Sequence, residues 1–253
     1  YHASPLRGNL AHVTIEPMRR IAVEHFCDTW TQAIYRQIES TQSSEIGRFT
    51  SSEDIAIKES EALKAAIYDP ERPRIRELAS NPLLVTILGL VFHSQGSLPQ
   101  QRAELYQRAM DILIEDWRKT GLSSAELSLV LSPLAAHIHQ NYATGLIQHK
   151  ELKELVAKYL SESPSFLSRN QVMDDKIEDF LRIIREDVGL LASRGEFLYG
   201  FLHLTFQEYL AALYLVRSKV DASQEIIDRL SDPRWQEPIL LALGYVSSTW
   251  GPV

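Results

Sequence analysis

The sequence predicts a mainly α-helical protein: a helical bundle, then a winged-helix domain with one short β-hairpin, then further C-terminal helices. Apolar residues recur at helical spacing through most segments from Glu16 onward. The alternating pattern of a half-buried strand is convincing only in one stretch, LLAS and EFLYGF within residues 190–201. Three helical segments precede that stretch and another follows it, an order typical of a winged helix.

The composition is that of a globular chain with an acidic balance. Its 253 residues are 45% hydrophobic, which is enough to bury the cores of two domains. The formal net charge of -7 makes nucleic acid an unfavourable main partner, because no overall basic field attracts a polyanion. Cys27 is the single cysteine, so no internal disulfide can form and we expect a reducing, cytoplasmic location.

Neither a membrane span nor a signal peptide is expected. The longest nearly uninterrupted apolar run, PLLVTILGLVF, is shorter than the roughly 20 residues that a membrane helix needs. It therefore predicts a buried helix. The chain opens with YHASPLRG, which is not a charged-then-apolar leader, and we expect a piece of a longer polypeptide.

The first predicted helix follows Pro17, a residue suited to a first helical turn. Its spacing places four residues on adjoining rows of one surface: Ile21, His25, Phe26 and Thr29.

A loop and three helices follow in the first half. Residues 40–52 are rich in Ser, Thr and Gln and predict a loop. Helices are expected at 52–68 and, after the chain-breaking DPERP, at 75–79. Asn81 is a good N-cap and Pro82 fits the first position of the next helix, where a missing N–H costs nothing.

RAELYQRAMDILIEDW predicts one more helix of the bundle, which Gly121 is expected to end. Its apolar face is expected to consist of Leu105, Ala109, Ile112, Leu113 and Trp117.

The second half predicts the winged helix. Helices are expected at residues 124–140, 150–161 and 170–187. Gly189 suits the C-terminal stop of the third helix, and a hairpin is expected to turn across Arg194 and Gly195. Beyond the domain, helices are expected near residues 222–230 and 235–247.

HLTFQEYLAA contains the start signal of the helix after the hairpin. Thr205 and Glu208 form a capping box, and Leu204 and Tyr209 form a hydrophobic staple, so we expect the helix to begin at Thr205. His203 then lies just outside an N-terminal end that favours phosphate or carboxylate. The alternative is that His203 only satisfies a backbone carbonyl between hairpin and helix.

These segments resemble NACHT proteins, the signalling ATPases that include animal NOD-like receptors and bacterial antiphage proteins. FLHLTFQEYLAALYL at 201–215 is similar to the signature that ends their winged-helix domain. LASNPLLVTILGLVFHSQGSLPQQRAELYQRAMDILIEDW at 78–117 resembles the helical domain after their ATPase core. HVTIEPM at 12–18 resembles the last strand of that core.

The resemblance implies that the chain consists of four segments with different roles. Residues 1–15 would end the ATPase core, 16–120 would be the NACHT-associated helical domain, 121–218 the winged-helix domain, and 219–253 the start of a helical linker or sensor region.

The resemblance also implies a nucleotide site. His203 stands where the winged-helix histidine of the family contacts the β-phosphate of bound ADP. Pro82 matches the proline that packs against adenine, with Asn81 and Leu83 beside it, although the helix-start preference of proline explains Pro82 equally well. The implied cofactor is ADP or ATP, with Mg held by an upstream core, and we expect no tight nucleotide binding by this chain alone.

The chain is not expected to be an enzyme by itself. It contains no G-x-x-x-x-G-K-[ST], and none of its 11 glycines is followed by lysine, so the phosphate loop of the family is missing. DILIED superficially resembles the acidic strand that coordinates Mg²⁺ in such ATPases, but Glu115 and Asp116 fall on the solvated side of a helix. The resemblance therefore implies an ATP-hydrolysing parent whose phosphate and Mg²⁺ motifs lie upstream of Tyr1.

Other candidate residues favour structural roles. His137 and His139 are two apart, so on a helix they cannot chelate one metal ion together, and no metal site is expected. His93 is expected to act as a dipole partner or C-terminal cap, and Cys27 as a small core residue.

Two functions remain. The first is the regulatory helical and winged-helix portion of a NACHT ATPase in immune or antiphage defence. Its partners would be the upstream nucleotide-binding core, sensor and effector domains, and other copies in an activated oligomer. The alternative is a winged-helix nucleic-acid-binding regulator with a helical dimerisation domain, supported by Arg182, Arg185 and Arg194. Against the alternative stand the net charge and the recognition-type helix QEYLAALYLV, which is apolar where a base-reading face should be polar and basic.

Overall fold

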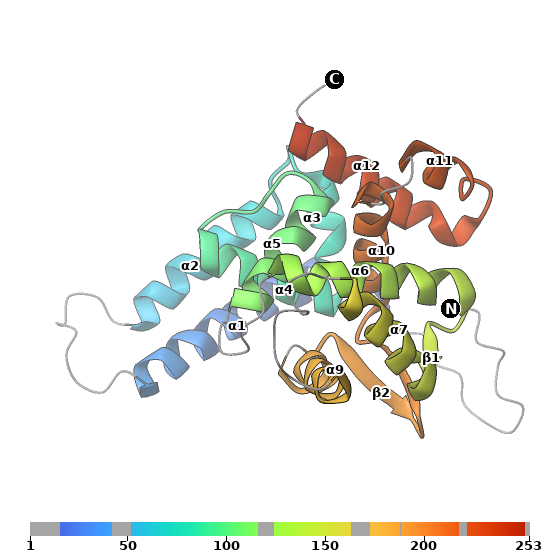
Figure 1. Ribbon diagram of the computed structural model, residues 1–253. Helices are drawn as coiled ribbons and strands as arrows, with labels where there is room; N and C mark the ends of the chain where they lie inside the picture. The colour runs from blue at the N-terminus through green and yellow to red at the C-terminus, as the bar shows by residue number, and fades with distance from the viewer. Residues whose placement is uncertain are drawn as a thin grey trace, which may run out of the picture. The chain divides into compact units, whose positions relative to one another are not determined.

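The computed structural model describes residues 16–41, 52–115, 124–162, 173–187, 189–217 and 222–250, and the chain divides into two compact units (Figure 1). A helical unit ends at Ile112, and the second unit, called the winged-helix unit below, continues from Leu113. The strand expected at the N-terminus, the loop before residue 52 and the stop at Gly121 lie outside the described residues.

The helical unit contains the helices that the sequence predicts. They are α1 (Arg20–Thr41), α2 (Ser52–Ile67), α3 (Pro73–Leu78), α4 (Pro82–Gln95) and α5 (Arg102–Glu115), of which α5 runs across the division between the units. The first helix begins at Arg20, three residues after Pro17.

The buried row of α1 differs from the rows that its sequence pattern singled out. Val23, Cys27 and Thr31, spaced four residues apart, are buried, whereas Ile21 is 81% exposed and His25 is exposed. The facing row of α2 contains small side chains, Ala56 and Ser60, followed by Leu63 and Ile67. Small residues let the two helices approach closely, so their packing rather than the largest apolar side chains decides which face of α1 is buried.

The winged-helix unit follows the order helix, strand, helix, helix, strand, strand. Its elements are α6 (Ser124–Asn141), β1 (Leu146–Gln148), α7 (His149–Ser161), α9 (Met173–Arg182) with a π-helical turn (Ile183–Asp187), β2 (Leu191–Gly195), β3 (Leu198–Phe201) and α10 (Leu204–Arg217). Three further elements complete the unit: α11 (Ala222–Ile227), a 3-10 turn (Pro233–Trp235) and α12 (Gln236–Trp250).

The sheet has three antiparallel strands in the order β1, β3, β2, one strand more than the predicted hairpin. β2 and β3 form that hairpin, but its turn lies at Glu196 and Phe197 rather than at Arg194 and Gly195. Phe197 takes the left-handed conformation, with φ of 60°, and the pairing is irregular between Ser193 and Gly195. The prediction was therefore right about the hairpin and wrong about its turn, because the bulge consumes the residues that resembled a turn.

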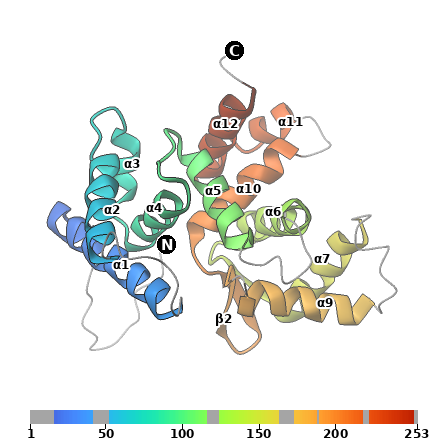
Figure 2. The ribbon, with the colours of Figure 1, turned by 90° about the vertical axis from the view of Figure 1, so that its left-hand side faces the viewer.

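Helix α10 packs between α6 and α12 (Figure 2). Its residues are buried on almost every side, including Phe206, Tyr209, Leu210 and Leu213. A helix that is apolar all round is typical of a core position. The start of α10 is therefore held in place by the core of the winged-helix unit.

Candidate functional site

His203 is the N-cap of α10, not a residue outside the helix. The helix begins at Leu204, and the backbone N–H of Thr205 donates to Nδ1 of His203 over 3.2 Å. The carbonyl of His203 accepts from the N–H of Phe206 at 3.2 Å, as an N-cap carbonyl does. The prediction that Thr205 caps the helix is wrong by two positions, because the imidazole takes the acceptor role that Thr205 was expected to fill.

The capping contact determines which nitrogen of His203 carries the proton. Because Nδ1 accepts a hydrogen bond, the neutral ring carries its hydrogen on Nε2. Nε2 has no protein partner in the described part of the chain. The side chain is half-buried, and this burial lowers its pKa. At neutral pH, His203 therefore presents an N–H donor at a helix N-terminus, where an anion is favoured.

Arg194 lies next to this start and was not expected there. Its Nη2 donates to the carbonyl of Leu202 over 2.8 Å, so a guanidinium from β2 is anchored on the residue before His203. Only one of the donors of Arg194 is used in this bond, which leaves others for an anion. The sequence pattern predicts Arg194 in the hairpin turn, and the eight positions that separate it from Leu202 give no local sign of this contact.

A buried series of hydrogen bonds, called the polar chain below, ties the first turn of α10 to its neighbours in the winged-helix unit. Gln207 Nε2 donates to His139 Nδ1 over 3.2 Å, and His139 Nε2 donates to the carbonyl of Arg234 over 2.8 Å. The imidazole of His139 packs edge-on against Trp235, with 4.9 Å between ring centroids, and burial lowers its pKa. This neutral histidine links α6, α10 and the turn before α12.

The predicted residues at the start of α4 form a closed cap. Asn81 Oδ1 accepts from the backbone N–H groups of Leu83 at 2.9 Å and Leu84 at 3.3 Å, and Pro82 at the first position has no N–H. The first three positions of α4 therefore offer no free backbone donor to an anion. Pro82 is exposed and Leu83 half-buried, so this start presents an apolar surface.

The four predicted residues belong to two different units. Asn81, Pro82 and Leu83 lie together in the helical unit, and His203 lies in the winged-helix unit. Each unit is described by itself, so the nucleotide role of these residues stays a prediction.

His137, His93 and Cys27 have structural surroundings that explain them without a ligand. Nε2 of His137 lies 2.9 Å from Glu151, so His137 and His139 point to separate partners. Nδ1 of His93 lies 2.8 Å from Glu59 on α2, and His93 stands in the last turn of α4, where a dipole partner is expected, but the C-cap is Gly96. Cys27 is fully buried and burial raises its pKa to about 11, which suits a core residue and not a nucleophile.

The winged-helix order assigns the base-reading position to α9, the helix before the hairpin, and not to α10 as the sequence reasoning assumed. The exposed charged residues of α9 are largely acidic: Asp175, Glu178, Asp179 and Arg182. Glu178 pairs with Lys153, and Arg182 pairs with Asp179. Such a face repels phosphates. The observation weighs against a nucleic-acid-binding role more directly than the apolar character of α10 does.

In the part of the chain that the structure describes, no helix is long and apolar enough to span a bilayer. Among the same residues, no group of three or more metal-ligating side chains is close enough to hold an ion.

Residues 102–215 match a sequence family described as the winged helix-turn-helix domain C-terminal to NACHT. The matched segment begins at the first residue of α5 and includes His203 near its end. No curated protein and no solved structure gives a significant match to the chain. The family match confirms the resemblance to a NACHT-associated winged-helix domain that FLHLTFQEYLAALYL suggested, while the resemblance of residues 12–18 to the ATPase core stays a prediction.

Proposed function

The chain carries the winged-helix domain that follows NACHT, and from this premise we propose that it is a regulatory portion that senses ADP or ATP bound by a NACHT core. His203 Nε2–H donates to a phosphate of ADP, and the surface at Pro82 and Leu83 packs against adenine beside Asn81. Mg²⁺ is held by the core and not by this chain. Loss of the His203 contact opens the protein.

The observation that supports this proposal most strongly is the capping geometry of His203. Its Nδ1 is occupied by the Thr205 N–H, and its Nε2–H is left for a ligand at the positive end of α10. A hydrogen bond to a charged group contributes roughly 1.5–3 kcal/mol. That free energy shifts a two-state equilibrium about tenfold to a hundredfold, enough to bias a closed form toward ADP.

Exchange of ADP for ATP would weaken this contact, release the winged-helix unit and allow oligomerisation with other copies. A sensor domain responding to a pathogen or phage would prompt the exchange, and an effector domain would carry the signal, in the cytoplasm. Because a ligand shifts an equilibrium only through its different affinities for the two states, the contact must discriminate the nucleotides.

The test uses a protein in which the NACHT core and this chain are joined, and measures ADP that remains bound after purification. His203→Asn is the informative variant, because asparagine is a preferred N-cap but lacks the Nε2 donor. We expect the affinity for ADP to fall about tenfold or more while the fold is retained.

His25→Asn is the matched control, since His25 is an exposed histidine on α1. It should leave ADP retention unchanged. Equal retention in the His203→Asn protein and the unmodified protein would show that His203 acts only as a helix cap.

A further inference from the structure

The winged-helix unit contains a cavity of about 500 Å³ that is separate from His203. Its floor is α6, one wall is the C-terminal end of α7, and the other wall comes from α10 and the segment after α11. This volume lies within the range of about 300–1,000 Å³ that small-molecule sites occupy.

The floor is shaped by Pro133 and Ser132 of α6. Pro133 lies inside the helix and has no N–H, so the carbonyl of Leu129 loses its helical partner at the cavity. Ser132 is 3% exposed, and its Oγ is buried without a hydrogen-bond partner in the described part of the chain. A buried hydroxyl that lines a cavity and lacks a partner is an available donor and acceptor.

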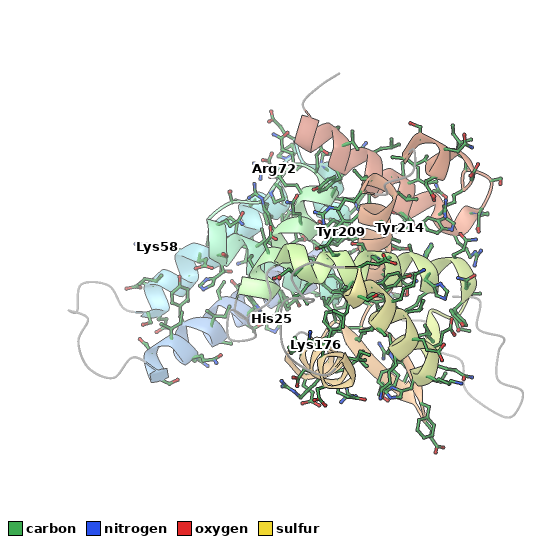
Figure 3. All side chains as sticks on the ribbon, viewed as in Figure 1. His25, Lys58, Arg72, Lys176, Tyr209 and Tyr214 are labelled. Atoms are coloured by element: carbon green, nitrogen blue, oxygen red, sulfur yellow. The ribbon has the colours of Figure 1, made fainter. Side chains whose placement is uncertain are left out.

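The walls carry two phenol rings. Tyr159 of α7 is half-buried, and burial, with Tyr214 and Glu162 nearby, raises its pKa to about 12. Tyr214 of α10, labelled in Figure 3, lines the same cavity. Aromatic rings on two walls suit contact with a planar apolar group.

Cations outnumber anions around the cavity. Lys158, Arg217 and Arg229 line it, and Glu162 is its one lining carboxylate among the described residues. Arg229 is paired with Glu225 and stacks over Trp235. Lys158 and Arg217 have no carboxylate partner in the described part of the chain, where Arg217 contacts only the hydroxyl of Tyr245 at 3.5 Å. Two uncompensated cations in an acidic chain favour an anionic ligand.

We propose that this cavity binds a small planar organic anion, with its charged group between Lys158 and Arg217, its ring between Tyr159 and Tyr214, and a polar atom at Ser132. The site lies outside the nucleotide contact proposed for His203 and does not depend on it. A ligand there would touch α6, α7 and α10 together, and would therefore stabilise the arrangement of three helices of the unit.

The test is a fluorescence titration of the whole chain with anilinonaphthalene sulfonate, which combines fused rings with one anionic group. We expect one saturable site. Phenyl phosphate and benzoate should displace the dye, and their relative strength tells whether the natural ligand is a phosphate or a carboxylate. Phenol, which lacks the charge, should not displace it.

Three variants make the test specific. Lys158→Ala with Arg217→Ala should weaken dye binding about tenfold or more, and both residues are exposed, so folding is unaffected. Lys150→Ala with Arg182→Ala removes the same charge outside the cavity and should have no effect. Ser132→Ala should weaken displacement by the anions without lowering the stability of the fold, because it removes a hydroxyl that has no partner.

Equal loss of binding in the two double variants would overturn the proposal, since the dye would then respond only to net charge. Binding without saturation, or dye that neither anion displaces, would overturn it as well.

Discussion

The starts of α4 and α10 are both capped helix N-termini, yet they offer opposite chemistry to a ligand. At α4, the Asn81 side chain accepts from two backbone N–H groups, and Pro82 removes a third donor. At α10, His203 accepts from one N–H through Nδ1 and keeps Nε2–H available. A helix N-terminus is therefore an anion site only when its cap leaves a donor, and here the identity of the cap residue decides between an apolar surface and a polar one.

The two starts also differ in what supports them. The first turn of α10 is tied to α6 and to the turn before α12 through Gln207, His139 and the carbonyl of Arg234. At the start of α4, Asn81 N–H donates to the carbonyl of Leu78 at 3.1 Å, and the carbonyl of Ser80 accepts from the N–H of Met18 at 2.7 Å, so this start has no bond to the polar chain. Damage to the polar chain should therefore affect α10 and leave α4 intact.

The largest expected effect is that of His139→Ala. This change leaves the Gln207 amide and the Arg234 carbonyl without a partner and opens space beside Trp235. We expect a loss of roughly 2–4 kcal/mol in the free energy of unfolding of the winged-helix unit. Urea titration followed by circular dichroism measures it.

His137→Ala is the control for His139→Ala, because His137 lies two residues away and its contact with Glu151 is only partly buried. It should cost less than about 1 kcal/mol. Equal losses in both variants would mean that the buried chain contributes no more than a surface contact.

The second expected effect concerns the caps themselves. Asn81→Ala should destabilise the helical unit by about 1 kcal/mol, and His203→Ala should destabilise the winged-helix unit by a similar amount, because each removes a capping acceptor. His203→Asn should recover most of the second loss. Thermal unfolding of the three variants measures these losses of stability. If His203→Asn is no more stable than His203→Ala, the imidazole acts through packing and not through capping.

Much of the fold could be predicted because local signals were strong. The Asn81–Pro82 pair marked the start of α4, and Gly189, with φ of 59°, ends the helical segment before β2 as expected. The strand β1 could not be predicted. Its three residues, Leu146–Gln148, are too few to show a period, and they become a strand only by pairing with β3.

Two local errors arose where preferred residue types pointed to the wrong position. Gly195 suggested the hairpin turn, but it lies in the irregular part of the β2–β3 pairing, and Phe197 takes the positive φ. Thr205 suggested an N-cap because threonine is preferred there, whereas His203 holds the position. In both cases the local geometry of the chain, a helix cap two residues earlier and an irregular strand pairing, outweighed a preference of about 1 kcal/mol.

The candidate site was predictable only in part, because the helix-start pattern of HLTFQEYLAA predicted an anion-favouring N-terminus and nothing more. The roles of His203, Pro82, Asn81 and Leu83 came from the resemblance to NACHT proteins. The contact of Arg194 with the carbonyl of Leu202 depends on the hairpin geometry and has no sequence signal.

The smallest expected effect is a pH dependence at the start of α10 that the start of α4 lacks. Burial holds the pKa of His203 below its ordinary value of 6.5. Above 6.5, the imidazole is neutral in both folded and unfolded chains, so the contribution of His203 to stability is fully present. As the pH falls, the unfolded chain takes up the proton first, and this stability is lost as the pH passes through the lower pKa of the folded state. His139, whose pKa is also lowered by burial, adds a loss of the same sign.

The difference in unfolding free energy between the unmodified chain and His203→Asn, measured by urea unfolding at about pH 7.5 and about pH 5.5, isolates the part due to His203. A His203→Asn chain that loses as much stability in acid as the unmodified chain would assign the whole pH dependence to His139 and remove this distinction between the two helix starts.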